Sequence, residues 1–276
     1  MIRQLQVRRQ LLLYLLLILV FFFPYMVLWL GNRIPFQLGL WWWSYIVSSV
    51  SIYLIGRQLW QKEVLYRLGL RMSWRTILGV LLLTIAFAIP VRILIFTIIT
   101  AHNVGFDPES TAGIAWIFPF FQALNEEIVF RSLILTWLAR FGRMRAALLS
   151  SFLFAGAHWF FYWIYEGVSL PFTSLITLFA FAMTGALLFL RYHHIGYGYA
   201  LHLGWNLTQV EGDFYGVANG KSFWLPEGTV FALLEGAPLV MLISLLILAI
   251  TLWLWLRQPP QEKETAQSAE STELAV

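Results

Sequence analysis

Eight long apolar segments run through this chain of 276 residues. A helix that crosses a lipid bilayer needs about 20 mostly apolar residues, and the segments fit that length, although the seventh is short and rich in glycine. We therefore predict an all-α polytopic membrane protein with about eight transmembrane helices. The predicted spans are 11–30, 36–55, 76–100, 113–139, 146–165, 171–190, 196–210 and 230–256.

Composition excludes an ordinary water-soluble domain. Hydrophobic residues make up 60% of the chain and charged residues 12%, with a mean hydropathy of +0.74, whereas soluble domains average about 25% charged residues. The absence of cysteine excludes disulfide and thiolate chemistry. The sequence pI is near 9.4, but the basic residues flank apolar segments, so we expect a lipid bilayer and no nucleic acid as partner.

The distribution of basic residues predicts the orientation. If the N-terminus is cytoplasmic and the eight spans alternate, almost all Lys and Arg fall on the inner side, as the positive-inside rule requires. Both termini of this multi-pass protein are then cytoplasmic. Residues 56–75 are basic and amphipathic and are expected along the inner interface, with a solvated loop as the alternative. Residues 1–257 form a single membrane-embedded domain, and the polar tail 258–276 is expected to be a disordered cytoplasmic segment.

Six polar residues interrupt the apolar segments in the middle of the chain. An ionisable side chain at bilayer depth costs roughly 2.5–3.5 kcal/mol, so it normally pairs, faces a cavity or serves function. Several of them in one chain predict a polar chamber inside the membrane. The residues are Glu126, Glu127, Arg131, His158, His202 and Asn206.

The spacing of the glutamates assigns them different tasks. Adjacent helical residues point about 100° apart, so the two carboxylates face different directions. Glu127 and Arg131 are four residues apart with the acid first, the favourable order for an ion pair. Glu126 is left on another face, where a low-dielectric site would make it a competent base.

These side chains are the parts needed to hydrolyse an amide with water. A carboxylate and a histidine, Glu126 and His158, can hold and deprotonate a water molecule. A second histidine with an amide, His202 and Asn206, can donate hydrogen bonds to an oxyanion. Ser150 and Ser151 lie two turns from His158 but no Gly-x-Ser-x-Gly accompanies them, so the serine alternative is weak.

The same side chains could instead bind zinc, through Glu126, His158 and His202. A catalytic zinc usually has three protein ligands. With Glu127 engaged by Arg131 and His202 paired with Asn206, the site is one ligand short, so we expect no metal or other cofactor. The His-Glu-x-x-His spacing of many metalloproteases is also missing.

Three ordered motifs resemble a known family. Glu-Glu-x-x-x-Arg at 126–131, Phe-x-x-x-His at 154–158 and His-x-x-x-Asn at 202–206 are similar to those of the CAAX protease and bacteriocin-processing (CPBP, or Abi) family, which includes the Rce1-like endopeptidases. The resemblance covers about 113–210, the core of the chain. It implies an eight-helix fold and peptide cleavage by a glutamate-activated water, in a family whose name as metalloproteases is partly historical.

The resemblance also implies individual roles. Glu126 would activate the water and His158 would position it. His202 and Asn206 would stabilise the oxyanion, while Glu127 and Arg131 would support the site. The substrate would be a peptide or protein, prenylated or otherwise membrane-associated, that enters from the membrane or the cytoplasmic side.

Two other functions use the same residues. In a proton-coupled transporter or channel, carboxylates and histidines relay protons, but such proteins commonly carry inverted repeats that this sequence does not show. A non-catalytic immunity-type membrane protein would keep the fold and lose motif residues, whereas all three motifs are intact.

Overall fold

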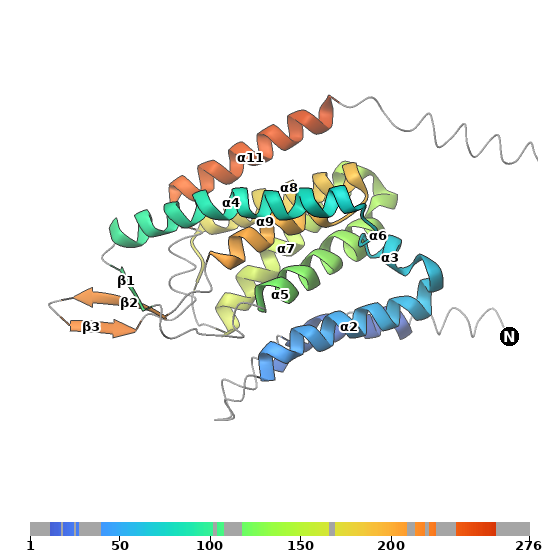
Figure 1. Ribbon diagram of the computed structural model, residues 1–276, viewed down its shortest axis with the longest axis horizontal. Coiled ribbons are helices and arrows are strands. Elements are labelled where there is room, and N and C mark those ends of the chain that lie inside the picture. Colours follow the sequence, from blue (N-terminus) through green and yellow to red (C-terminus); the bar gives the residue numbers. More distant parts are fainter. Residues whose placement is uncertain are drawn as a thin grey trace, which may run out of the picture.

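The computed structural model shows a body of long helices with a small sheet at one end (Figure 1). The predicted helical architecture is confirmed for the described residues. The structure describes residues 12–17, 19–24, 26–27, 40–101, 104–107, 118–165, 169–208, 213–218, 221–224 and 236–257. The tail 258–276, predicted to be disordered, lies outside these residues.

The helices follow the predicted apolar segments closely. Pro171 is the N-cap residue of one helix, and Pro238 lies in the first turn of another. The long helices are α2 (Leu40–Trp60), α4 (Trp74–Ala101), α5 (Phe118–Glu127), α7 (Arg143–Tyr165), α8 (Phe172–Tyr192), α9 (Gly196–Leu207) and α11 (Pro238–Leu256). Short elements join them: η1 (Gln61–Glu63), α3 (Val64–Arg67), the π-helical η4 (Ile128–Leu135), α6 (Thr136–Leu138) and η5 (Ala139–Phe141).

Four described helices are long and apolar enough to cross a membrane by length and composition. They are Trp74–Leu94, Arg143–Ile164, Phe172–Tyr192 and Pro238–Leu256. A shorter apolar helix covers Leu12–Pro24, within the first predicted span, and the seventh predicted span is represented by the 12 residues of α9. The number of eight spans therefore stays a prediction.

Helix α8 lies at the centre of the helical body. It packs against α7, α9 and α11, while α9 also contacts α4 and α5, and α2 packs on α5 (Figure 1). In the most apolar 18-residue stretch of α8, 67% of the residues are buried, compared with 11% in the corresponding stretch of α11. The apolar side chains that α11 leaves exposed suit contact with lipid chains, because hydrocarbon rather than water is the solvent there.

A three-stranded antiparallel sheet corrects the all-α prediction in detail. Strand β1 (Val104–Asp107) pairs with β2 (Asp213–Ala218), which pairs with β3 (Lys221–Trp224). All three strands lie between predicted spans, where loops were expected. The sheet lies at the end of the body where α4 ends, opposite α3 and α6 (Figure 1). It joins the segment after α4 to the segment after α9, two helices that pack together.

Candidate active site

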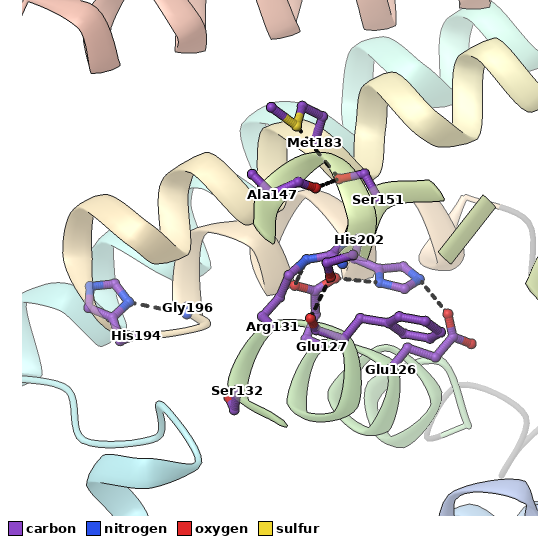
Figure 2. A network of polar contacts seen from close by, with 12 residues as sticks. Glu126, Glu127, Arg131, Ser132, Ala147, Ser151, Met183, His194, Gly196 and His202 are labelled. Atoms are coloured by element: carbon purple, nitrogen blue, oxygen red, sulfur yellow. Dashed lines mark hydrogen bonds and ion pairs between the residues drawn. The ribbon is translucent and has the colours of Figure 1, made fainter. Parts of the chain in front are cut away.

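The two glutamates lie at the end of α5, in the interior of the helical body (Figure 2). Each is 1% exposed. The preceding residue, Asn125, fixes this end of α5 against α2: its side-chain amide donates to the Tyr45 carbonyl at 3.1 Å, and its Oδ1 accepts from the Ser49 hydroxyl at 2.8 Å. Asn125 therefore sets the position of the carboxylates, because its buried amide forms hydrogen bonds that join α5 to α2.

The predicted ion pair between Glu127 and Arg131 is present. Arg131 Nε lies 3.3 Å from Glu127 Oε2, and both side chains are 1% exposed. The chain turns π-helical at Ile128, directly after the glutamate pair. π-Helical turns are rare and frequent at functional sites, because the wider turn changes where side chains point.

The Arg131 guanidinium is held mainly by the ring of Phe154 and by the charge of Glu127. It stacks over the Phe154 ring, with 5.0 Å between Cζ and the ring centroid, a favourable cation–π contact. Its Nη1 and Nη2 have no hydrogen-bond partner among the described residues. Glu127 is therefore the essential counter-charge of this buried cation.

Two glycines make room for the ion pair. A Cβ on Gly198 would lie 2.8 Å from Glu127 Oε2 and 3.3 Å from the Gly185 Cα, and a Cβ on Gly185 would lie 3.0 Å from Arg131 Nε. Helices α8 and α9 can therefore approach each other and the ion pair only because both positions lack a side chain.

Gly198→Ala is expected to lower the melting temperature of the purified protein and its activity together. Overpacking a filled site costs about 1–3 kcal/mol, and here the added methyl group displaces Glu127. The matched control is Gly156→Ala on α7, where a Cβ would meet no atom within 4 Å. The control should be neutral or stabilising by about 0.5–1 kcal/mol. Equal melting temperatures for the two variants would contradict this packing.

Glu126 meets two histidines from two other helices. His158 Nε2 of α7 lies 3.4 Å from Glu126 Oε2, and His202 Nε2 of α9 lies 3.6 Å from the same oxygen. His158 Nδ1 lies 3.0 Å from the Phe154 carbonyl. A carbonyl only accepts, so Nδ1 carries a proton, and in a neutral ring the Nε2 lone pair points towards Glu126. The arrangement can hold a water molecule between a carboxylate and an imidazole.

His202 contacts both glutamates, which differs from the prediction. The predicted partner of His202 was Asn206, one turn along α9. Instead its Nδ1 lies 3.1 Å from Glu127 Oε1 while its Nε2 faces Glu126 (Figure 2). A neutral His202 donates its Nδ1 hydrogen to Glu127, and a protonated ring donates towards both carboxylates. His202 therefore links the supporting ion pair to the base.

Among the predicted site residues, Asn206 is the one whose side-chain amide nitrogen lacks a hydrogen bond to the described residues of the site. Its Nδ2 is buried and has no hydrogen-bond partner among the described residues. An unsatisfied buried donor costs about 1–3 kcal/mol, so such a group calls for a partner that arrives from elsewhere.

The cluster is open on the side of His158. The His158 side chain is 20% exposed, compared with 5% for His202 and 1% for Glu126. The Phe154 ring packs on both histidines as well as on Arg131, with centroid distances of 4.3 Å to His158 and 5.9 Å to His202. The buried Phe154 thus orients three members of the site.

Both serine hydroxyls near His158 are bonded to backbone carbonyls. The Ser150 hydroxyl donates to the Phe130 carbonyl at 2.7 Å, and the Ser151 hydroxyl donates to the Ala147 carbonyl at 2.7 Å. The first bond ties α7 to the π-helical segment, and the second lies within α7. Both hydroxyls are buried and committed to backbone oxygens, so their roles are structural.

The alternative zinc site does not fit the described side chains. No group of three or more His, Asp or Glu residues in the described part of the chain has an arrangement that could hold a metal ion. His202 is engaged by Glu127 on one side, and Glu127 is itself paired with Arg131. A metalloprotease reading is therefore not supported by this donor set.

Comparison with known proteins supplies the family. Residues 108–208 match the model of the family described as type II CAAX prenyl endopeptidase Rce1-like. This part of the chain is therefore similar to Rce1-like domains. The match covers all three motifs and confirms the resemblance predicted from them. No curated protein and no solved structure matches the chain. The Rce1-like family supports assignment to the membrane-embedded proteases, which act on peptide substrates.

Sequence reasoning missed three kinds of residue in this site. Asn125 was visible beside the glutamates, but its bonds to α2 were not. Phe154 was noted only as a motif letter, although it packs on Arg131 and both histidines. Gly185 and Gly198 carried a weak signal as small residues within apolar helices, which is typical of close helix packing in membranes.

Proposed function

We propose that this Rce1-like chain is an intramembrane endopeptidase that cleaves a CAAX-type prenylated peptide with a water activated by Glu126. One observation carries the proposal: side chains from three helices, Glu126, His158 and His202, converge at one buried carboxylate oxygen. Burial matters because an electrostatic interaction in a water-poor site is stronger than in bulk water.

The proposed reaction begins with a water molecule held by Glu126 and His158. Glu126 takes one proton from the water, and the resulting hydroxide attacks the carbonyl carbon of the peptide bond. The carbonyl oxygen becomes an oxyanion in a tetrahedral intermediate. Glu126 then delivers its proton to the leaving nitrogen, the C–N bond breaks, and a carboxylic acid and an amine leave the site.

His202 and Asn206 are proposed to stabilise the oxyanion. The unpaired Nδ2 of Asn206 is one available donor. His202 can donate from Nε2 only when its ring is protonated, because its Nδ1 already faces Glu127. A protonated His202 together with Arg131 would balance the charges of the two carboxylates, so the buried cluster would be neutral. Each oxyanion donor contributes about 10²–10³-fold to turnover.

The substrate class is tested with a pair of peptides. One peptide ends in a prenylated cysteine followed by three residues, and its control has the same sequence without the lipid. The wild-type protein in vesicles should release the terminal tripeptide from the prenylated peptide at least ten times faster. Equal cleavage of both peptides would place the substrate among other membrane-associated peptides, and cleavage of neither would contradict the CAAX-type proposal.

We propose eight spans with both termini in the cytoplasm. The sheet that contains Asp213 lies at one end of the helical body, and the short helix α6, shortly before Arg145, lies at the other (Figure 1). Reporter fusions after Arg145 and after Asp213 should therefore read opposite sides of the membrane. Signals from the same side would contradict the topology.

We propose that the water is activated without a tightly bound metal ion. Purified active protein should contain well below one zinc per chain by elemental analysis, and a chelator should leave the cleavage rate unchanged. Stoichiometric zinc, with activity lost on chelation and restored by zinc, would contradict this mechanism and make His202 a ligand.

A further inference from the structure

A groove lies far from the glutamate cluster along the sequence, where α2 meets α3. Its volume is about 950 Å³, and its lining combines apolar side chains such as Leu54 and Leu65 with the basic side chains of Arg57 and Lys62. Leu54 is 53% exposed and Leu65 is 47% exposed. We call this surface, which extends over residues 53–65, the elbow groove.

The charge of the elbow groove is not balanced within the described structure. Arg57 and Lys62 are exposed and make no ion pair or hydrogen bond with other described residues. The acid nearby, Glu63, is taken by Arg67 at 3.2 Å. Between residues 56 and 75 the sequence has five basic residues and one acidic residue, so the groove attracts an anion.

The backbone of the elbow is fixed in place rather than free to collapse. The hydroxyl of Ser132, beside Arg131, donates to the Leu68 carbonyl at 2.7 Å, and the Ile195 amide donates to the Gly69 carbonyl at 3.0 Å. Val64 and Leu68 are buried. The groove is therefore preformed and attached to the helices that carry the catalytic candidates.

Gln61 adds an independent sign of function. It lines the groove and adopts a left-handed conformation, with φ at 50°. A residue with a side chain is strained there, and such strain gathers at ligand clamps and other functional sites. Here the strained turn directs the chain from α2 into the elbow, between the lining residues Arg57 and Lys62 in the sequence.

We propose that the elbow groove binds one anionic phospholipid of the inner leaflet. Arg57 and Lys62 would contact the phosphate headgroup, and an acyl chain would lie along Leu54 and Leu65. Nearby Tyr66 and Trp74, which are 55% and 68% exposed, are aromatic residues of the kind that gathers at membrane interfaces. This site is separate from the proposed protease activity, and its test does not depend on that activity.

Native mass spectrometry of the full chain tests the proposal. The protein is reconstituted in vesicles with equal parts phosphatidylglycerol and phosphatidylcholine, extracted, and scored for retained lipid. A basic residue near an anionic surface contributes about 5-fold to binding, so Arg57→Gln with Lys62→Gln should reduce phosphatidylglycerol retention by roughly 30-fold. The exchanged pair Arg57→Lys with Lys62→Arg should retain the lipid.

The matched control removes two other exposed charges from the same end of the body, Arg140→Gln with Arg257→Gln. These arginines stack on Trp137 and Trp253 and line no part of the elbow groove. The control should retain lipid as the wild type does. The proposal is overturned if the elbow variant keeps its lipid, if the control loses as much, or if millimolar inorganic phosphate displaces the lipid. The last outcome would indicate a site for free phosphate.

Discussion

Glu126→Gln is expected to lower the turnover of a cleavable peptide by about 10²–10⁴-fold, the usual contribution of a general base. The substitution keeps the size of the side chain and removes its ability to accept a proton from water. The ion pair between Glu127 and Arg131 is retained, so the protein should still insert and melt near the wild-type temperature. Turnover is measured with purified protein in vesicles by quantifying the released peptide.

The matched control for this change is Glu63→Gln. Glu63 undergoes the same chemical substitution but lies in an exposed pair with Arg67, and such pairs contribute little to stability. Its activity should match that of the wild type. Near-normal turnover in the Glu126 variant would remove Glu126 from the role of base.

Glu127→Gln is expected to destabilise the fold as well as to abolish activity. Glu127 is the counter-charge of buried Arg131 and accepts from His202 Nδ1. Removing one partner of a buried ion pair costs about 3–5 kcal/mol, because the other charge is left uncompensated. The yield of monodisperse protein after extraction and its melting temperature should both fall clearly below those of the Glu126 variant.

A double variant separates the loss of charge balance from the loss of activity. Glu127→Gln with Arg131→Met removes both charges, and replacing a buried ion pair by neutral groups is often close to neutral in stability. The double variant should recover much of the melting temperature and remain inactive, because His202 has lost its orienting carboxylate. A double variant less stable than Glu127→Gln would contradict the assignment of Arg131 as an uncompensated charge.

Local features of the site could be predicted from the sequence, and contacts between helices could not. The ion pair between Glu127 and Arg131 follows from a spacing of four residues on one helix. The contact between His202 and Glu127 joins residues 75 positions apart, and it depends on how α9 is rotated against α5. The partner predicted for His202 was therefore a neighbour on its own helix.

The fold shows the same division between local and long-range information. Apolar length identified the long helices, because the bilayer sets the number of residues that each needs. The π-helical turns after Glu127 leave no mark in the pattern of apolar residues. The strands 104–107 and 213–218 are short and far apart in the sequence, so their pairing could not be predicted without knowing that α4 and α9 lie together.

The most direct test of the account is a cleavage reaction in ¹⁸O-labelled water that also contains hydroxylamine. A water activated by Glu126 attacks the peptide directly, so the new carboxylate should carry one solvent ¹⁸O, and mass spectrometry should find no hydroxamate. A covalent acyl-enzyme would instead be trapped by hydroxylamine. Hydroxamate product, or intact peptide in the presence of folded wild-type protein, would contradict the account.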